Sequence, residues 1–104
     1  MQVIEPLRGW TGRFFHSVHM TFGHWDISED AADLHDHHHV QEEVWNVVSG
    51  EIVLVVDGHE HRLQAGSAAI VPSDVPHSAR VLGACRAVVV DHPVRTELPA
   101  QHSA

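Results

Sequence analysis

Histidine and carboxylate side chains crowd the segment Leu34-His35-Asp36-His37-His38-His39-Val40-Gln41-Glu42-Glu43. On a β-strand, side chains two residues apart lie on the same face about 6.5 Å apart, so His37 and His39 can converge on one metal ion while His38 points away. The three residues that follow allow a bend that brings the Glu43 carboxylate to the same side. A solvated polar loop is the alternative interpretation of such a cluster.

A fourth ligand can come from a distant segment. Imidazole and carboxylate are the usual ligands of borderline divalent metals, and a rigid turn normally delivers the last of them. His77 follows the turn Pro72-Ser73-Asp74-Val75-Pro76, which is stiffened by its two prolines, so its imidazole loses little conformational entropy when it is held in place. His77 is therefore the candidate fourth ligand.

The elements that must position these side chains are β-strands. No window has the apolar spacing of an amphipathic helix, whereas short β-branched and aromatic runs alternate with Gly, Pro, Asp and Ser. The pattern predicts strands at roughly 13–22, 24–28, 34–39, 43–48, 51–57, 59–65, 68–72, 77–82 and 86–92. It also predicts a two-residue hairpin turn at Asp57-Gly58 and loosely attached arms at 1–10 and 96–104. The expected class is an all-β barrel or sandwich.

Two spaced patterns resemble the two signature motifs of the cupin superfamily in order, internal spacing and separation: His37-x-His39-x3-Glu43-x6-Gly50, followed by Gly66-x5-Pro72-x4-His77. The resemblance implies a cupin jelly-roll barrel, also called a double-stranded β-helix, as one domain over residues 1–104 with a barrel core at about 12–93. The chain departs from the motifs at three positions: Ala31 and Asp74 stand where the motifs have glycine, and Val81 stands where they have asparagine. None of these positions is a metal ligand, so the departures concern loop conformation rather than the metal site.

Carried over to this chain, the resemblance implies that His37, His39, Glu43 and His77 hold one divalent transition metal inside the barrel, namely iron, manganese, nickel, zinc or copper. Three neutral imidazoles and one carboxylate leave the ion a net charge of about +1 and two open positions in an octahedral shell. Vicinal diols, 2-oxo acids, enediols and dioxygen then become plausible guests. Because neutral imidazole is required, we expect the metal to be lost as the pH falls below about 6.

Alternation along the flanking strands predicts the wall of the pocket. Counted from the carboxylate ligand, it places Trp45 and Val47 on the ligand face, with core packing as the alternative for the tryptophan. Counted from the last histidine ligand, it places Ala79 and Val81 inward, which leaves a small apolar wall beside that ligand.

Alternation along residues 14–22 leaves two sets open for the cavity face, either His16, Val18, Met20 and Phe22 or Phe15, Ser17, His19 and Thr21. His16 and His19 are candidate acid/base groups because imidazole titrates near neutral pH. A surface position is the alternative interpretation for each of them.

The end of the last strand is similar to the C-terminal segment of the small pectin-degradation cupins that open unsaturated uronates, where an Asp-x-Phe-x-Pro-x-Arg sequence puts functional side chains near the metal. Aligned on Pro93 and Arg95, this chain has Val89 in place of the acid and Asp91 in place of the aromatic residue. Asp91 is therefore the candidate general acid or base, and Arg95 a candidate clamp for a substrate carboxylate. A surface carboxylate and a solvated charge are the alternatives.

Composition limits the partners. The 104 residues include 14 acidic and six Lys or Arg side chains, which give a formal net charge of −8, so we expect no nucleic-acid partner. No apolar run approaches the about 20 residues of a membrane span, and the one cysteine, Cys85, cannot form an internal disulfide, so we expect a cytoplasmic protein without a membrane partner. We also expect a homodimer that buries Trp10, Phe14 and Phe15 against its partner.

Two classes of function fit these residues. The first is a metal-dependent enzyme, with isomerase, lyase or dioxygenase chemistry, in which the metal polarises a small oxygenated, anionic metabolite while Asp91 or a nearby histidine moves a proton. The alternative is a non-catalytic small-molecule or sugar-binding cupin whose metal serves ligand capture or stability.

Overall fold

The computed structural model describes residues 1–100, and in that range it contains strands and no helix. The strands are β1 (Gln2–Leu7), β2 (Trp10–His16), β3 (Thr21–Ile27), β4 (Leu34–His37), β5 (Glu42–Ser49), β6 (Glu51–Val56), β7 (His59–Gln64), β8 (Ala68–Val71), β9 (His77–Val81) and β10 (Cys85–His92). Among these residues no helix is long and apolar enough to cross a membrane. The predicted all-β class is confirmed.

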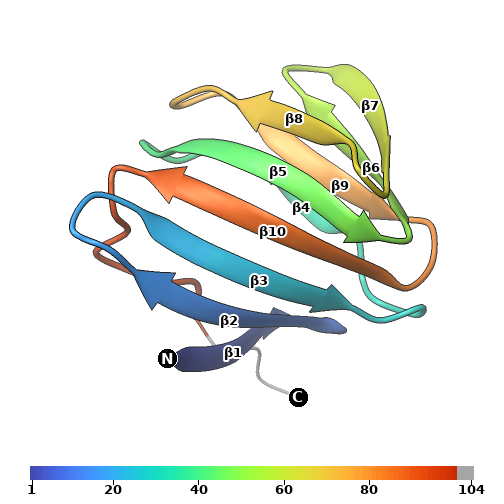
Figure 1. Cartoon of the computed structure of the whole chain (residues 1–104). Helices are drawn as coiled ribbons and strands as arrows, with labels where there is room; N and C mark the ends of the chain where they lie inside the picture. The colour runs from blue at the N-terminus through green and yellow to red at the C-terminus, as the bar shows by residue number, and fades with distance from the viewer. Residues whose placement is uncertain (101–104) are drawn as a thin grey trace.

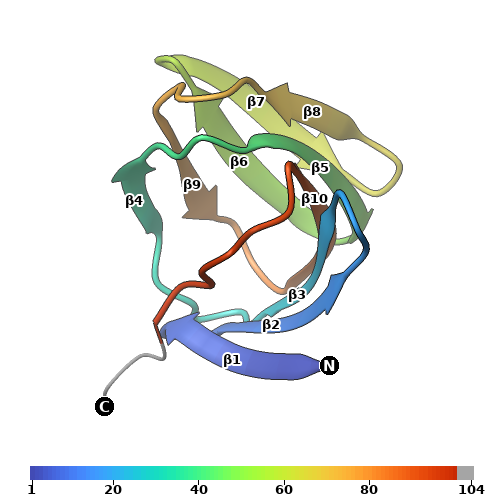
Figure 2. The ribbon, with the colours of Figure 1, turned by 90° about the vertical axis from the view of Figure 1, so that its left-hand side faces the viewer.

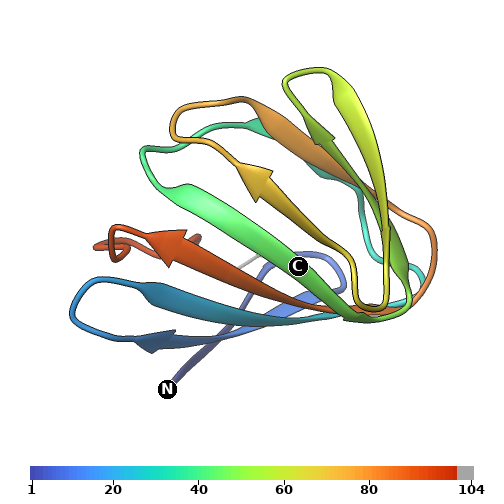
Figure 3. The ribbon, with the colours of Figure 1, turned by 45° about the horizontal axis from the view of Figure 1, so that its top comes forward.

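Two antiparallel sheets face each other. The larger has the strand order β1-β2-β3-β10-β5-β8, and its strands lie side by side in Figure 1; the smaller has the order β4-β9-β6-β7. Figure 2 shows both sheets curving round a common interior, with the segment after β10 running across the end that faces the viewer. In Figure 3 the sheets come together where β5 turns into β6 and separate towards the opposite side.

Strand register decides which side chains meet inside. In the larger sheet β10 pairs with β5 so that Asp91 lies opposite Glu43. In the smaller sheet β4 pairs with β9 so that His37 lies opposite His77. The pairing of β4 is shifted between Leu34 and His37, and such an irregularity re-aims side chains that simple alternation would place on opposite faces.

The core fills the space between the sheets. Alternation is regular on β5, where residues 43, 45 and 47 are buried and the residues between them are exposed. Both sheets contribute to one apolar cluster, which consists of Trp10, Ile27, Trp45, Val47, Ile52, Leu54, Val56, Leu63, Val71, Ala79, Cys85 and Val89.

The predicted hairpin turn between β6 and β7 is confirmed. Asp57 and Gly58 both have positive φ angles, of 50° and 78°, which match the right-handed twist of the flanking strands. Val56 pairs with His59 directly across the turn.

The strand predicted over 13–22 is wrong, because the chain reverses at residues 17–20 and forms a hairpin of β2 and β3. The Ser17 hydroxyl accepts hydrogen bonds from the backbone N–H groups of His19 and Met20, at 3.3 and 3.0 Å, which stabilises a turn within a run of strand-forming residues. Because of this turn, neither of the two sets of residues predicted within 14–22 faces the interior in full. Phe14 and Thr21 are buried, whereas Val18, Met20 and Phe22 are exposed.

The N-terminal residues also differ from expectation. Residues 2–7, expected as part of an arm, form β1 at the edge of the larger sheet, where Pro6 is tolerated because an edge strand leaves one row of N–H groups unused. Trp10 and Phe14 are buried in the protomer itself, so of the three aromatic residues expected at a partner surface only Phe15 is exposed.

Candidate metal centre

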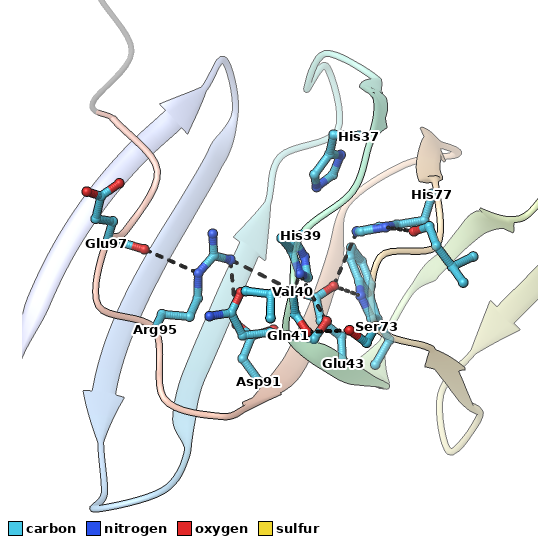
Figure 4. Close-up of polar contacts among 12 residues, drawn as sticks. His37, His39, Val40, Gln41, Glu43, Ser73, His77, Asp91, Arg95 and Glu97 are labelled. Carbon is cyan, nitrogen blue, oxygen red and sulfur yellow. Dashed lines mark hydrogen bonds and ion pairs between the residues drawn. The ribbon is translucent and has the colours of Figure 1, made fainter.

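The four motif side chains come together between the sheets (Figure 4). His37 ends β4, Glu43 lies on β5 and His77 begins β9. His39 lies beyond the end of β4, so it reaches the site from a loop and not by alternation along the strand predicted over 34–39. One ring nitrogen from each of the three histidines lies within 4.8 Å of the others. Glu43 places Oε2 3.2 Å from His39 Nε2 and Oε1 3.4 Å from His77 Nε2.

The turn between the two prolines is fastened to the histidine loop. Ser73 Oγ donates a hydrogen bond to the Val40 carbonyl at 2.7 Å, and the Asp74 N–H donates to the His39 carbonyl at 2.8 Å. These contacts hold the start of β9, and with it His77, at a fixed distance from the loop that carries His39.

Each of the three imidazoles is oriented by a backbone carbonyl two residues away. The distances from Nδ1 to that oxygen are 2.9 Å for His37, 3.0 Å for His39 and 3.2 Å for His77. A carbonyl only accepts, so Nδ1 carries the proton and Nε2 keeps its lone pair. This is the tautomer of a histidine that binds a metal through Nε2, with the other nitrogen fixed by an outer partner.

The Nε2 atoms supply the test of whether a metal fits. Those of His39 and His77 are buried, in side chains 13% and 1% exposed, and neither makes a hydrogen bond within residues 1–100. Buried polar atoms without a partner are rare in folded proteins. The unpaired Nε2 lone pairs of His39 and His77 converge with a third imidazole and a carboxylate. This donor set suits a divalent transition metal.

Glu43 is held as a carboxylate. Burial alone would raise its pKa, but contacts with His39, His77, Asp91 and Trp45 outweigh burial and hold the pKa far below its usual range. The Trp45 indole N–H donates to Oε1 at 3.0 Å in a buried contact, so the carboxylate is both ionised and fixed in direction.

Asp91 is held in the opposite protonation state. Burial, followed by the contact with the negative charge of Glu43, raises the pKa of Asp91 to about 9, although Arg95 opposes the shift. Arg95 Nη1 lies 3.6 Å from Asp91 Oδ2 and 4.0 Å from Glu43 Oε2. Asp91 Oδ1 is buried and has no hydrogen-bond partner among the described residues. A neutral carboxylic acid and a guanidinium therefore lie beside the carboxylate.

These polar groups line a cavity of about 60 Å³. Its other wall is aromatic, made by Trp10, Phe14, Trp25 and Trp45, whose rings pack edge to face at centroid distances of 5.4–6.3 Å. Pro99, in the segment after β10, also borders it. The site is thus a small, mostly enclosed space with an apolar side and a charged side.

Comparison with known proteins identifies the family. Residues 23–91 match the family described as the cupin domain, which is more than half of the chain. The chain belongs to the cupin family. No curated protein matches it. The resemblance inferred from the two spaced motifs is thereby confirmed.

Solved cupin structures show the same fold. An RmlC-like cupin from Shewanella frigidimarina NCIMB 400 gives a TM-score of 0.83 at 23% identity, over 91% of this chain and 86% of that chain. KdgF from Halomonas sp. gives 0.80 at 22% identity, with coverages of 91% and 86%. The DMSP lyase DddQ from Ruegeria pomeroyi DSS-3 gives 0.76 at 21% identity, over 88% of this chain and 51% of that chain.

The other side chains predicted for the site divide into two groups. Trp45, Asp91 and Arg95 line the cavity of this cupin. Val47 and Ala79 lie in the core cluster, and Val81 packs against it, so these three do not border the cavity. They alternate correctly with the ligands but lie further along their strands, away from the cavity.

His16 and His19 lie away from the metal ligands. His19 is in the exposed turn between β2 and β3. His16 is exposed, and its Nδ1 lies 2.8 Å from Thr21 Oγ1, so neither histidine borders the cavity. The turn that interrupts the predicted strand is the physical reason.

Sequence reasoning missed part of the aromatic wall. Trp10, Phe14 and Trp25 come from β2 and β3, which pair so that Trp25 lies opposite Gly12. A Cβ at Gly12 would lie 2.9 Å from the Trp25 ring, so the glycine leaves room for the indole. On these strands glycines and large aromatic residues alternate two residues apart on one face, at Gly12 and Gly23, and this pattern could have predicted the aromatic wall.

Proposed function

We propose that this cupin is a metal-dependent enzyme for a small, oxygenated, anionic metabolite, with isomerase, lyase or dioxygenase chemistry. The observation that carries the proposal is geometric: Asp91 and Arg95 lie in the same cavity as the Glu43 carboxylate and the His77 imidazole, and burial and the Glu43 charge raise the pKa of Asp91 while its contacts lower that of Glu43. Titratable groups whose environments push their pKa values apart are typical of acid/base sites. The resemblance of the fold to a structure named as a DMSP lyase is compatible with such chemistry.

His37, His39, Glu43 and His77 would hold the metal, and iron, manganese, nickel, zinc and copper all suit this donor set. When bound, such an ion acts as a Lewis acid towards an oxygen of the substrate. In the metal-free protein Glu43 opposes the effect of burial and raises the pKa of His77, so protons compete with the metal for this nitrogen.

The remaining roles belong to side chains on the charged wall. Arg95 would pair with a carboxylate of the substrate, since its side chain is 19% exposed and lines the cavity. Asp91 would hold a proton on its carboxyl group and deliver it to a substrate carbon or oxygen. The aromatic wall would exclude water, and the volume of about 60 Å³ restricts the guest to a small molecule.

The test is a screen of small 2-oxo, 2-hydroxy and enediol carboxylates by NMR, with protein loaded with each candidate metal. We expect turnover by the wild type and a loss of about 10²–10⁴-fold in Asp91→Asn, with metal content and melting temperature of the loaded protein retained. A non-catalytic binding cupin would give ligand binding of equal affinity in both proteins and no product after long incubation. That result would overturn the enzyme proposal.

We also propose a cytoplasmic homodimer whose ligand is a small molecule rather than a nucleic acid or a membrane. The net charge of −8 supports the choice of ligand class, and the buried thiol of Cys85, the one cysteine, suits a reducing compartment. Cell fractionation tests the location, and light scattering tests the homodimer.

A further inference from the structure

A row of apolar side chains crosses the outer face of the larger sheet. The pairing register joins Phe15 on β2 to Phe22 on β3, Phe22 to Val90 on β10, Val90 to Val44 on β5, and Val44 to Ile70 on β8. Paired residues of neighbouring strands project from the same face of a sheet. These five residues, which we call the apolar row, therefore form one line across five strands.

The apolar row faces solvent in the protomer. Phe15 is 51% exposed, Phe22 46%, Val44 38% and Ile70 61%, and Val90 is half-buried. On β3, β10 and β5 the residues on either side of each row member are buried, so the row is the outward half of a regular alternation. Beside it, Phe15, Met20 and Phe22 help to line a surface hollow of about 350 Å³.

Charge makes this face suitable for a second copy of the chain. Across β2, β3, β10, β5 and β8 the outward-facing Lys, Arg, Asp and Glu side chains are Arg13, Asp26, Arg86 and Glu42, two of each sign. Asp26 forms ion pairs with both arginines, at 2.6 and 2.7 Å. The whole chain carries −8, so two copies repel each other least where they meet through this neutral face.

The exposed apolar area is about three quarters of the apolar area that a standard homodimer interface buries. A half-exposed phenylalanine presents about 100 Å², so the apolar row together with Met20 presents on the order of 400 Å² of apolar surface per copy. A standard interface buries about 800 Å² per partner, of which about 65% is apolar in homodimers. The row and its neighbours supply most of that apolar share.

We propose that the outer face of the six-stranded sheet, centred on the apolar row, is the surface through which two copies of this chain pair. The inference rests on the proposed homodimer and is independent of the proposed metal chemistry. The pairing is face to face and two-fold symmetric, so each copy uses the same patch. It packs the outer side of β5 and β10, the two strands whose inner sides carry Glu43 and Asp91.

The test measures molar mass by light scattering and sedimentation over a dilution series. Phe15→Glu and Ile70→Glu place a charge at opposite ends of the row, on different strands, so a folding failure of one leaves the other informative. Leu82→Glu is the matched control, because Leu82 is 48% exposed and lies outside the row, between β9 and β10. Circular dichroism and metal content verify that each variant is folded.

We expect wild type and Leu82→Glu at about twice 11.5 kDa, and both row variants at 11.5 kDa with wild-type metal content. A monomeric wild type would overturn the homodimer and this surface together. A dimeric wild type whose row variants also stay dimeric would overturn this surface alone. Dissociation by Leu82→Glu as well would show that the row has no special part in pairing, which also overturns the proposal.

Discussion

Replacing Trp45 by phenylalanine removes the indole N–H that donates to Glu43 Oε1 at 3.0 Å. A hydrogen bond to a charged group contributes about 1.5–3 kcal/mol, and loss of a partner that orients a metal ligand typically weakens metal affinity 10–100-fold. We therefore expect the Kd for Zn²⁺ to rise about 10–100-fold, or about 1.4–2.7 kcal/mol.

Trp10→Phe is the matched control. Trp10 is as buried as Trp45, at 3% exposure, and its indole also donates one hydrogen bond, at 2.7 Å, but to the Ala32 carbonyl. Both substitutions shrink a ring in the same aromatic cluster, so we expect both to lower the free energy of unfolding by about 1–3 kcal/mol. Only Trp45→Phe should weaken metal binding beyond that shared effect.

The assay is competition between metal-free protein and a chromophoric chelator, with urea unfolding followed in parallel. Equal changes in Kd for the two variants would mean that the aromatic cluster acts on the metal only through stability. An unchanged Kd in Trp45→Phe would refute the view that its indole fixes the Glu43 carboxylate.

Three further predictions concern stability. Burial and the neighbouring carboxylate raise the pKa of Asp91 to about 9 in the folded protein, against about 3.9 in the unfolded chain. Folding therefore keeps Asp91 protonated, and the free energy of unfolding falls as the pH rises from about 4 towards 9. In calorimetry, metal-free Asp91→Asn should melt at a higher temperature than metal-free wild type at pH 8 and at the same temperature near pH 4. Gly50→Ala should cost more than about 3 kcal/mol in urea unfolding, because a Cβ there would lie 2.1 Å from the Ala84 carbonyl oxygen. Gly58→Ala, with nearly the same φ but no atom within 4 Å, should cost only about 1 kcal/mol, and similar losses for the two would contradict the clash. Asp26→Asn should cost no more than about 1 kcal/mol at pH 7, since the side chains of its two ion pairs are 35–55% exposed and solvent screens them. Because hydrogen bonds from both arginines lower the pKa of Asp26, that deficit is present above the unfolded pKa and should shrink as the pH falls towards this lowered pKa; a deficit that stays constant throughout an acid titration would contradict the ion-pair account.

The side chains that meet at the candidate metal centre could be predicted because their spacing is local. His37, His39 and Glu43 lie within seven residues, and His77 directly follows a turn stiffened by prolines, so short-range geometry decides most of their arrangement. The reason given for His39 was nevertheless wrong in detail, because a loop and not a strand carries it.

The rest of the cavity depends on strand pairing, which a single sequence does not state. Strand propensity ran unbroken through 13–22 and concealed the turn that the Ser17 hydroxyl stabilises. Without that turn, the inward face of β2 and β3 could not be assigned, and Trp10 and Phe14 were expected at a partner surface instead of in the interior. The position of Asp91 opposite Glu43 likewise follows from the register of β10 on β5.

Elemental analysis of tag-free protein tests the central claim most directly, with His77→Ala beside His61→Ala, which removes an exposed histidine on β7. We predict close to one transition-metal ion per chain in the wild type and in His61→Ala, and close to none in His77→Ala. Equal metal in all three proteins, or several ions per wild-type chain, would contradict a single buried centre and assign the binding to surface histidines.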